Sequence, residues 1–265
     1  MPNINLDHSE INFDRDRLIQ FDEATHTYTV DNLGTLTSVS NVVARFFRPF
    51  DAKEASLKKC NYDEEAAERL REEWECKGVF ASQAGTHLHL QIENYLNGKG
   101  TPQMTCHCRY DGKTQTQEQD IDISREWQHF LAFDRDTEYQ PFRTEWRVYA
   151  DDERIAGTID LTCIRPDGTY EIYDWKRSGK IDPVPSRVFH FGINGLELLP
   201  DTAFYHYCIQ QNLYRYILQT YYGLTVSRLH LVVLHPTEPS YRIEQVPLLD
   251  KEVRLILDYI KNNPA

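Results

Sequence analysis

The stretch 156–178, AGTIDLTCIRPDGTYEIYDWKRS, predicts two short β-strands joined by a tight turn. Between the strands lie three residues that favour a hairpin turn: Pro166, Asp167 and Gly168. Because side chains alternate between the faces of a strand, Asp174 and Lys176 project together from the second strand. On the first strand Asp160 lies beside Thr158 and Thr162, and the opposite face consists of Ile159, Leu161 and Cys163. The hairpin therefore lets the two aspartates converge.

Two carboxylates and an ammonium group in one hairpin indicate a site for a divalent cation. Mg²⁺ prefers oxygen ligands at roughly 2.0–2.1 Å, often one or two carboxylates together with water and phosphate oxygens. Asp160 and Asp174 supply such ligands, and Lys176 then lies where it can orient a water or neutralise a phosphate. The alternative is a surface hairpin with solvated charges, since Asp and Lys are usually exposed.

Two predicted helices carry further candidates. In residues 80–97 an apolar stripe recurs every fourth residue, and His89 and Glu93 form a second stripe beside it. Residues 205–222 form a tyrosine-rich helix with Gln210 and Tyr214 one turn apart. A histidine beside an apolar stripe is more often packed than functional, and tyrosines in a helix are more often core.

Five sequence elements occur in a single order across residues 85–214. They are the GTHLHLQIE segment with His89 and Glu93, then Glu145, then GTID ending at Asp160, then Asp174-Trp-Lys176, and then Gln210-x-x-x-Tyr214. Together they resemble the PD-(D/E)XK nuclease superfamily, and most of all its RecB-like branch. That branch includes the mitochondrial genome maintenance exonuclease and viral and phage relatives. The chain departs from the pattern in having Ile159 before Asp160 and Asp174 as the second acid.

The resemblance implies a role for each matching residue. It implies four ligands for Mg²⁺ or Mn²⁺: His89, Asp160, Asp174 and the backbone carbonyl of Trp175. It implies that Asp160, Asp174 and Lys176 are the catalytic residues, with Lys176 positioning the attacking water. We expect Glu93 and Glu145 to support the site or bind a second ion. Gln210 and Tyr214 are implied to contact substrate, and we expect the same of Arg177, which lies in a basic stretch.

The order of predicted elements gives the expected fold. A helix, three strands, a second helix and a further strand (αβββαβ) form the restriction-endonuclease-like α/β core implied by the resemblance, a mixed central sheet flanked by helices. We assign residues 80–265 to this core. We expect residues 1–79 to be a helical portion packed on it, the whole forming one compact domain. Residues 100–119 lack periodicity and predict an exposed loop.

Composition limits the environment and the cofactors. Six cysteines do not form a disulfide framework and predict reduced thiols. Cys106-His107-Cys108 is too tightly spaced for a common zinc knuckle, so we interpret it as a surface coincidence. Some RecB-like relatives hold an iron–sulfur cluster with C-terminal cysteines, which this sequence does not have after Cys208, so we predict none. No apolar segment or signal pattern is present, which predicts a soluble, intracellular protein with no membrane contact.

The net charge of −12 is unusual for a protein that binds nucleic acid. Basic residues nevertheless concentrate near the motif, from Arg143 to Arg187, and predict a local basic groove. Phe189 and Phe191 follow this stretch and either stack on bases or belong to the core.

Three functions are consistent with these features. The first is a metal-dependent nuclease that hydrolyses DNA phosphodiester bonds, most readily as an exonuclease or end-processing enzyme that prefers single strands or free ends. The second is an endonuclease that acts on DNA or RNA. The third is a non-catalytic nucleic-acid-binding protein that retains the fold.

Overall fold

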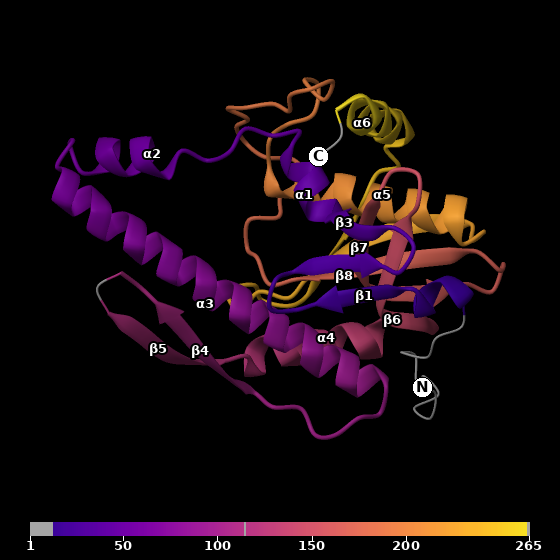
Figure 1. Cartoon of the computed structure of the whole chain (residues 1–265). Coiled ribbons are helices and arrows are strands. Elements are labelled where there is room, and N and C mark those ends of the chain that lie inside the picture. Colours follow the sequence, from indigo (N-terminus) through magenta and orange to yellow (C-terminus); the bar gives the residue numbers. More distant parts are fainter. Residues whose placement is uncertain (1–12, 114, 264–265) are drawn as a thin grey trace.

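The computed structural model describes residues 13–113 and 115–263. These residues form a mixed α/β fold around an eight-stranded sheet (Figure 1). The strands follow the order β1-β2-β3-β7-β8-β9-β10, and β6 pairs with β7. The sheet strands are β1 (Ile19–Asp22), β2 (Thr27–Val30), β3 (Gly34–Ser38), β6 (Pro141–Ala150), β7 (Ile155–Ile164), β8 (Tyr170–Lys176), β9 (Val226–Val233) and β10 (Arg242–Gln245).

Helices cover both faces of this sheet, as expected for a mixed α/β fold. They are α1 (Val39–Ala44), α2 (Ala52–Lys59), α3 (Glu64–Leu96), α4 (Ser124–Asp136), α5 (Ala203–Tyr221) and α6 (Asp250–Asn262), preceded by the 3-10 turn η1 (Asp14–Arg17). One apolar core joins the sheet to α1, α5 and α6, and a second joins it to α3, α4 and the strand β4 (Thr105–Asp111). Figure 1 shows these two layers on either side of the strands.

The predicted hairpin is present as β7 and β8. The strands pair antiparallel from Leu161↔Tyr173 to Ile164↔Tyr170. Gly168 adopts a left-handed φ of 79° in the turn, which glycine adopts without strain. After β8 the chain crosses over through α5 and returns as β9, parallel to β8. Both faces of β9 are buried, with Leu231 in one core and Val232 in the other, which explains its nearly continuous apolar sequence.

The N-terminal portion differs from the expected helical one. Three strands, β1 to β3, extend the central sheet, and Tyr28 and Val30 pack with Tyr149 of β6 in a small third core. Alternation in the HTYTV segment that contains Tyr28 and Val30 is the local reason for this strand. The assumed boundary at residue 79 falls inside α3, which runs unbroken from Glu64 to Leu96. Residues 1–12 of that portion lie outside the described residues.

The prediction of a loop over residues 100–119 is wrong. The segment contains β4, which pairs antiparallel with β5 (Thr116–Asp122) in a separate two-stranded sheet. Every second residue of β4 is buried against α3: Cys106, Cys108 and Tyr110. The two thiols, with sulfur atoms 3.5 Å apart, are thus interior groups and not a surface coincidence. Cysteine behaves as an apolar residue here, which turns TCHCRYD into an alternating strand.

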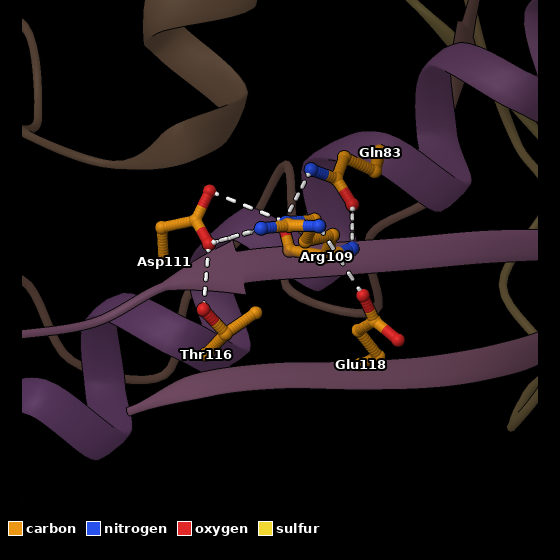
Figure 2. A network of polar contacts seen from close by, with 5 residues as sticks. All are labelled: Gln83, Arg109, Asp111, Thr116 and Glu118. Atoms are coloured by element: carbon orange, nitrogen blue, oxygen red, sulfur yellow. Dashed lines mark hydrogen bonds and ion pairs between the residues drawn. The ribbon is translucent and has the colours of Figure 1, made fainter. Parts of the chain in front are cut away.

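A network of polar contacts covers the outer face of this hairpin, and Gln83 joins it to α3 (Figure 2). The side-chain amide of Gln83 donates to the carbonyl of Arg109 and accepts from its N–H, at 2.9 and 2.8 Å. The Arg109 guanidinium donates to Asp111 and Glu118, and Thr116 donates to Asp111. Gln83 therefore acts as a substitute strand partner for β4.

Strand β7 and helix α5 approach each other closely at Gly157 and Tyr214. A Cβ atom at Gly157 would lie 2.6 Å from Cε1 of Tyr214 and 2.7 Å from its hydroxyl oxygen. The absence of a side chain at Gly157 therefore lets the buried Tyr214 ring lie directly on the strand.

We expect Gly157→Ala to lower the free energy of unfolding by about 1–3 kcal/mol, because an extra methyl group overpacks a dense core. Gly78→Ala is the matched control, since Gly78 is exposed in α3 and a methyl group there would meet no atom within 4 Å. That control should gain about 0.5–1 kcal/mol from helix propensity. Equal urea midpoints for the two variants would contradict the proposed contact.

Candidate metal and phosphate site

The site lies where β7 changes its neighbour. One edge of β7 is occupied by β6 from Ile155 to Cys163. On the other edge β3 pairs only with Ile155 and Ala156, and β8 pairs only from Leu161 onward. Residues 157–160 therefore face a split between strands. Across this split the Asp160 Oδ2 accepts a 2.8 Å hydrogen bond from the backbone N–H of Trp175, which replaces the missing ladder contact.

Glu145 of β6 lies opposite Asp160, between the pairs Thr144↔Leu161 and Trp146↔Ile159. Its φ of 42° is left-handed, a strained conformation for a side chain of this kind. Thr144 accepts a hydrogen bond from Asn97 at the end of α3, whereas Trp146 packs in the α5 core. In a regular strand these two residues would share a face. The kink at Glu145 therefore reverses the alternation of β6.

The same reversal occurs on β7 and corrects the predicted strand faces. Ile159 lies in the α5 core, whereas Leu161 and Cys163 lie in the α3 and α4 core. The prediction that these three share one face is therefore wrong. Thr158 and Thr162 also separate, since Thr158 bonds Tyr28 of β2, and Thr162 pairs with Ile172 and is fully buried.

Helix α3 supplies His89 to this site. The predicted apolar stripe of Leu88, Ile92 and Leu96 is buried, which orients the adjacent stripe toward the strands. His89 Nε2 lies 2.9 Å from the Trp175 carbonyl oxygen, and Nδ1 lies 3.5 Å from Asp160 Oδ2. A carbonyl only accepts, so Nε2 donates to it, and in the neutral imidazole Nδ1 keeps a free lone pair facing the carboxylates. Such a second hydrogen bond is typical of histidines that bind metals.

His89, Glu145 and Asp160 converge on one point, with one potential ligand atom from each within 4.8 Å of the others. Burial raises the pKa of Glu145 well above its ordinary value, and the charges of Asp160, Glu93 and Asp174 raise it further, while Arg147 opposes them. Concentrated negative charge and an imidazole lone pair form a donor set that suits Mg²⁺ or Mn²⁺. The residues present therefore fit a divalent cation.

Asp174 and Lys176 form a buried ion pair beside this cluster. Their Oδ2 and Nζ atoms are 2.6 Å apart, and the Lys176 ammonium lies 4.3 Å from the centre of the Tyr207 ring. Burial, together with the charge of Asp160, raises the pKa of Asp174 to about 6 against the opposing charge of Lys176. Burial lowers the pKa of Lys176, but Asp174 and Asp160 outweigh this and raise it overall. Lys176 is therefore charged at neutral pH.

The remaining residues predicted for the site interact with its members or with one another. The Trp175 carbonyl, expected to bind metal, accepts from His89 instead, so its role as a ligand stays a prediction. Glu93 is near enough for its charge to affect Glu145. Gln210 donates to the Tyr214 hydroxyl at 3.2 Å, and burial raises the pKa of Tyr214. Tyr214 is buried beneath Gly157, which makes direct contact with substrate unfavourable in this arrangement.

Arg177 is not brought to the cation cluster. Its Nε donates to Glu126 of α4 at 2.8 Å, and the Glu126 side chain is fully buried. This ion pair makes Arg177 a poor candidate for a substrate contact, and the assigned role remains a prediction.

Sequence reasoning missed the contribution of the β1–β2 hairpin to the site. The Tyr28 hydroxyl lies 2.9 Å from the Thr158 hydroxyl, two residues before Asp160. The strand character of residues 26–30 was readable from the sequence, but its pairing across more than a hundred residues was not.

Comparisons with known proteins add little. No family model matches this sequence, and no curated protein matches it. Among solved structures, 12 chains match. One of them is described as the crystal structure of SSO0001, with a TM-score of 0.34 and 15% sequence identity, covering 86% of this chain and 76% of that chain. A likeness at this level carries no argument about function. Of the helices in residues 13–113 and 115–263, none has the length and apolarity needed to cross a bilayer.

We expect Glu145→Gln to stabilise the metal-free protein at pH 8, because it removes one charge from a crowded, partly buried cluster. The folded-state pKa of Glu145 lies above its unfolded value, so folding binds the proton and stability falls as pH rises from about 4.5 through the folded pKa. Thermal unfolding in EDTA should show a melting temperature a few degrees above wild type at pH 8 and little difference at pH 5. Glu118→Gln, at an exposed carboxylate, is the control. A melting temperature below wild type at pH 8 would contradict the electrostatic account.

We also expect Mn²⁺ to bind wild-type protein more tightly as pH rises from 5 to 7.5. Asp174, with a pKa of about 6, and Glu145 hold protons at the lower pH, and a cation must displace them. Calorimetric titration at several pH values measures this, with proton release detected by using buffers of different ionisation enthalpy. Affinity independent of pH across this range would argue against carboxylate ligands.

Proposed function

We propose that this chain is a divalent-metal-dependent nuclease that hydrolyses phosphodiester bonds in DNA, acting as an exonuclease or end-processing enzyme on single strands or free ends. The observation that carries the proposal is the convergence of His89, Glu145 and Asp160 next to the Asp174–Lys176 ion pair. This combination supports the implied membership of the PD-(D/E)XK superfamily and its restriction-endonuclease-like core.

In this proposal His89, Glu145 and Asp160 hold the cation, and Asp174 completes the negative surroundings. A bound Mg²⁺ or Mn²⁺ would polarise the phosphoryl oxygen and lower the pKa of a bound water. The imidazole makes Mn²⁺ more suitable than it would be at an all-oxygen site. Trp175 orients His89 and Asp160 through its carbonyl and its N–H respectively, which keeps both ligands in place before substrate binds.

Lys176 provides the positive charge for the reacting phosphate. Its ammonium has three donors, of which one direction is taken by Asp174, so the others are available for a water or a phosphate oxygen. The side chain is 15% exposed, enough to reach solvent from a buried stem. Donors fixed before reaction stabilise charge that develops in the transition state without reorganisation. The Asp174 contact thus fixes Lys176 in the charged form and in position.

Cleavage of linear and circular single-stranded DNA tests the proposed reaction. With Mg²⁺ or Mn²⁺, we expect linear strands to be degraded, circular strands to persist, and EDTA to stop the reaction. Cleavage of circles would instead indicate an endonuclease, and a parallel RNA substrate would identify a ribonuclease. Binding of DNA without cleavage by either metal would favour a non-catalytic role and contradict the proposal.

We expect Lys176→Ala to reduce cleavage by about 10²-fold or more while metal still binds, because it removes a preorganised positive charge. Asp160→Asn should weaken both Mn²⁺ binding and cleavage, because it removes a ligand charge. The control is Lys113→Ala, which removes an exposed lysine between β4 and β5 that pairs with Glu68 of α3. Normal cleavage by Lys176→Ala, measured beside calorimetry, would exclude the role assigned to this lysine.

A further inference from the structure

Arg147 is an exposed cation at the edge of the acidic cluster. It lies two residues after Glu145 on β6 and pairs directly with Thr158 of β7, two residues before Asp160. All other residues of this ten-residue strand are buried or half-buried, and only Arg147 is exposed. Among the described residues, strand β6 pairs only with β7, so Arg147 lies on an edge strand with its side chain open to a ligand.

The β1–β2 hairpin holds Arg147 in place. The guanidinium carbon lies 5.8 Å from the centre of the Phe21 ring, a cation–π contact. Phe21 packs on Tyr28 with ring centres 4.5 Å apart, and the Tyr28 hydroxyl reaches Thr158. Arg147, Thr158 and the hairpin therefore form one continuous surface, which continues along β6 and β7 to Glu145 and Asp160.

Arg147 acts on Glu145 through its charge but forms no close ion pair with it, unlike the nearby arginines, which are held by direct partners. Arg143 pairs with buried Asp16, and Arg177 pairs with buried Glu126. Arg154 donates to the carbonyls of Leu33 and Thr35. For Arg147, no ion pair within 4.0 Å is found among the residues that the structure describes, and its contact is with an aromatic ring. The guanidinium donors that do not face Phe21 remain available.

We propose that Arg147 binds a backbone phosphate of the nucleic acid that neighbours the scissile phosphate. The proposal rests on the nuclease function above and deepens it, since it assigns a specific contact to the substrate strand. Two residues along a strand span about 6.6–6.8 Å. Arg147 therefore lies about this far along β6 from Glu145, which faces Asp160 (the carboxylate rung), and is within reach of an adjoining nucleotide. The planar guanidinium fork matches phosphate oxygens. In a protein with a net charge of −12, a cation placed in this way attracts the polyanion locally, beside the proposed cation site.

Salt-dependent binding of a fluorescent single-stranded oligonucleotide tests this contact. Full-length wild type, Arg147→Ala and Arg147→Lys are compared in Ca²⁺, with intact oligonucleotide confirmed by gel electrophoresis. Arg228→Ala is the matched control, because Arg228 is exposed on β9 opposite Glu171, five residues before Lys176 on β8. It removes the same charge from the same sheet, but away from the site.

We expect Arg147→Ala to weaken binding about tenfold at low salt, as a lost charged hydrogen bond predicts. The slope of log affinity against log salt should fall in magnitude by about 0.7 because one phosphate contact is lost. Arg147→Lys should keep the wild-type slope with intermediate affinity, since it retains the charge but not the fork. Mn²⁺ affinity should change less than twofold in Arg147→Lys, which keeps the charge that acts on Glu145.

The outcomes separate the two proposals. If Arg147→Ala and Arg228→Ala have the same slope and affinity while wild type binds and cleaves, the Arg147 contact is refuted and the nuclease function stands. If Arg147→Ala unfolds at a lower temperature than wild type, the test rests on Arg147→Lys. A wild-type salt slope for Arg147→Lys supports the contact. A slope reduced as in Arg147→Ala, while Arg228→Ala binds normally, refutes it. If wild type neither binds nor cleaves the oligonucleotide, both proposals fail.

Discussion

Mutual repulsion among clustered, partly buried carboxylates is the constraint on which the rest of this structure depends. The charges of Asp160 and Asp174 act on Glu145, that of Asp160 also acts on Asp174, and burial disfavours the ionised forms of Glu145 and Asp174. Such an arrangement is unfavourable unless a cation or protons balance it. One internal cation, Lys176, balances only Asp174 directly. The charge of Arg147 opposes the rise in the pKa of Glu145 without cancelling it, and the remaining negative charge is the physical reason to propose a metal site here.

The scaffold holds this repulsive cluster by contacts that do not involve charge. The Trp175 backbone binds both His89 and Asp160, so one peptide segment fixes two ligands from different elements. Gly157 allows Tyr214 to support β7 from the opposite face. Glu145, with its left-handed φ, interrupts the regular alternation of side chains along β6. The alternation along β7 is interrupted at the facing position, between Ile159 and Leu161. Strain of this kind, of order 1–3 kcal/mol per residue, persists only where surrounding packing enforces it.

Local patterns in the sequence were sufficient for some parts of this fold and not for others. The β7–β8 hairpin, the buried stripe of α3 and the doubly buried β9 follow from turn residues and periodicity within short windows. The faces of β7 were predicted wrongly, because the reversal at Asp160 depends on Glu145 of a neighbouring strand. The β4–β5 hairpin was missed because its alternation uses cysteines, and the place of β1–β3 depends on pairing with Ile155 and Ala156, far along the chain. Convergence of His89 with Asp160 was expected from the resemblance, whereas the central place of Glu145 and the position of Arg147 required coordinates.

Charge segregation explains how an acidic chain can present a surface to a polyanion. Two arginines near the site, Arg143 and Arg177, form ion pairs with buried carboxylates. Their charges are neutralised there and contribute little to the electrostatic potential at the protein surface. Lys176 and Arg147 differ, because one reaches solvent from a carboxylate pair and the other rests on an aromatic ring. An aromatic support orients a guanidinium without neutralising it, which a carboxylate partner would do. Positive charge is thereby kept available at Lys176 and Arg147, close to Glu145 and Asp160. In the proposed nuclease, a strand of phosphates would be attracted where a bound metal neutralises the carboxylates.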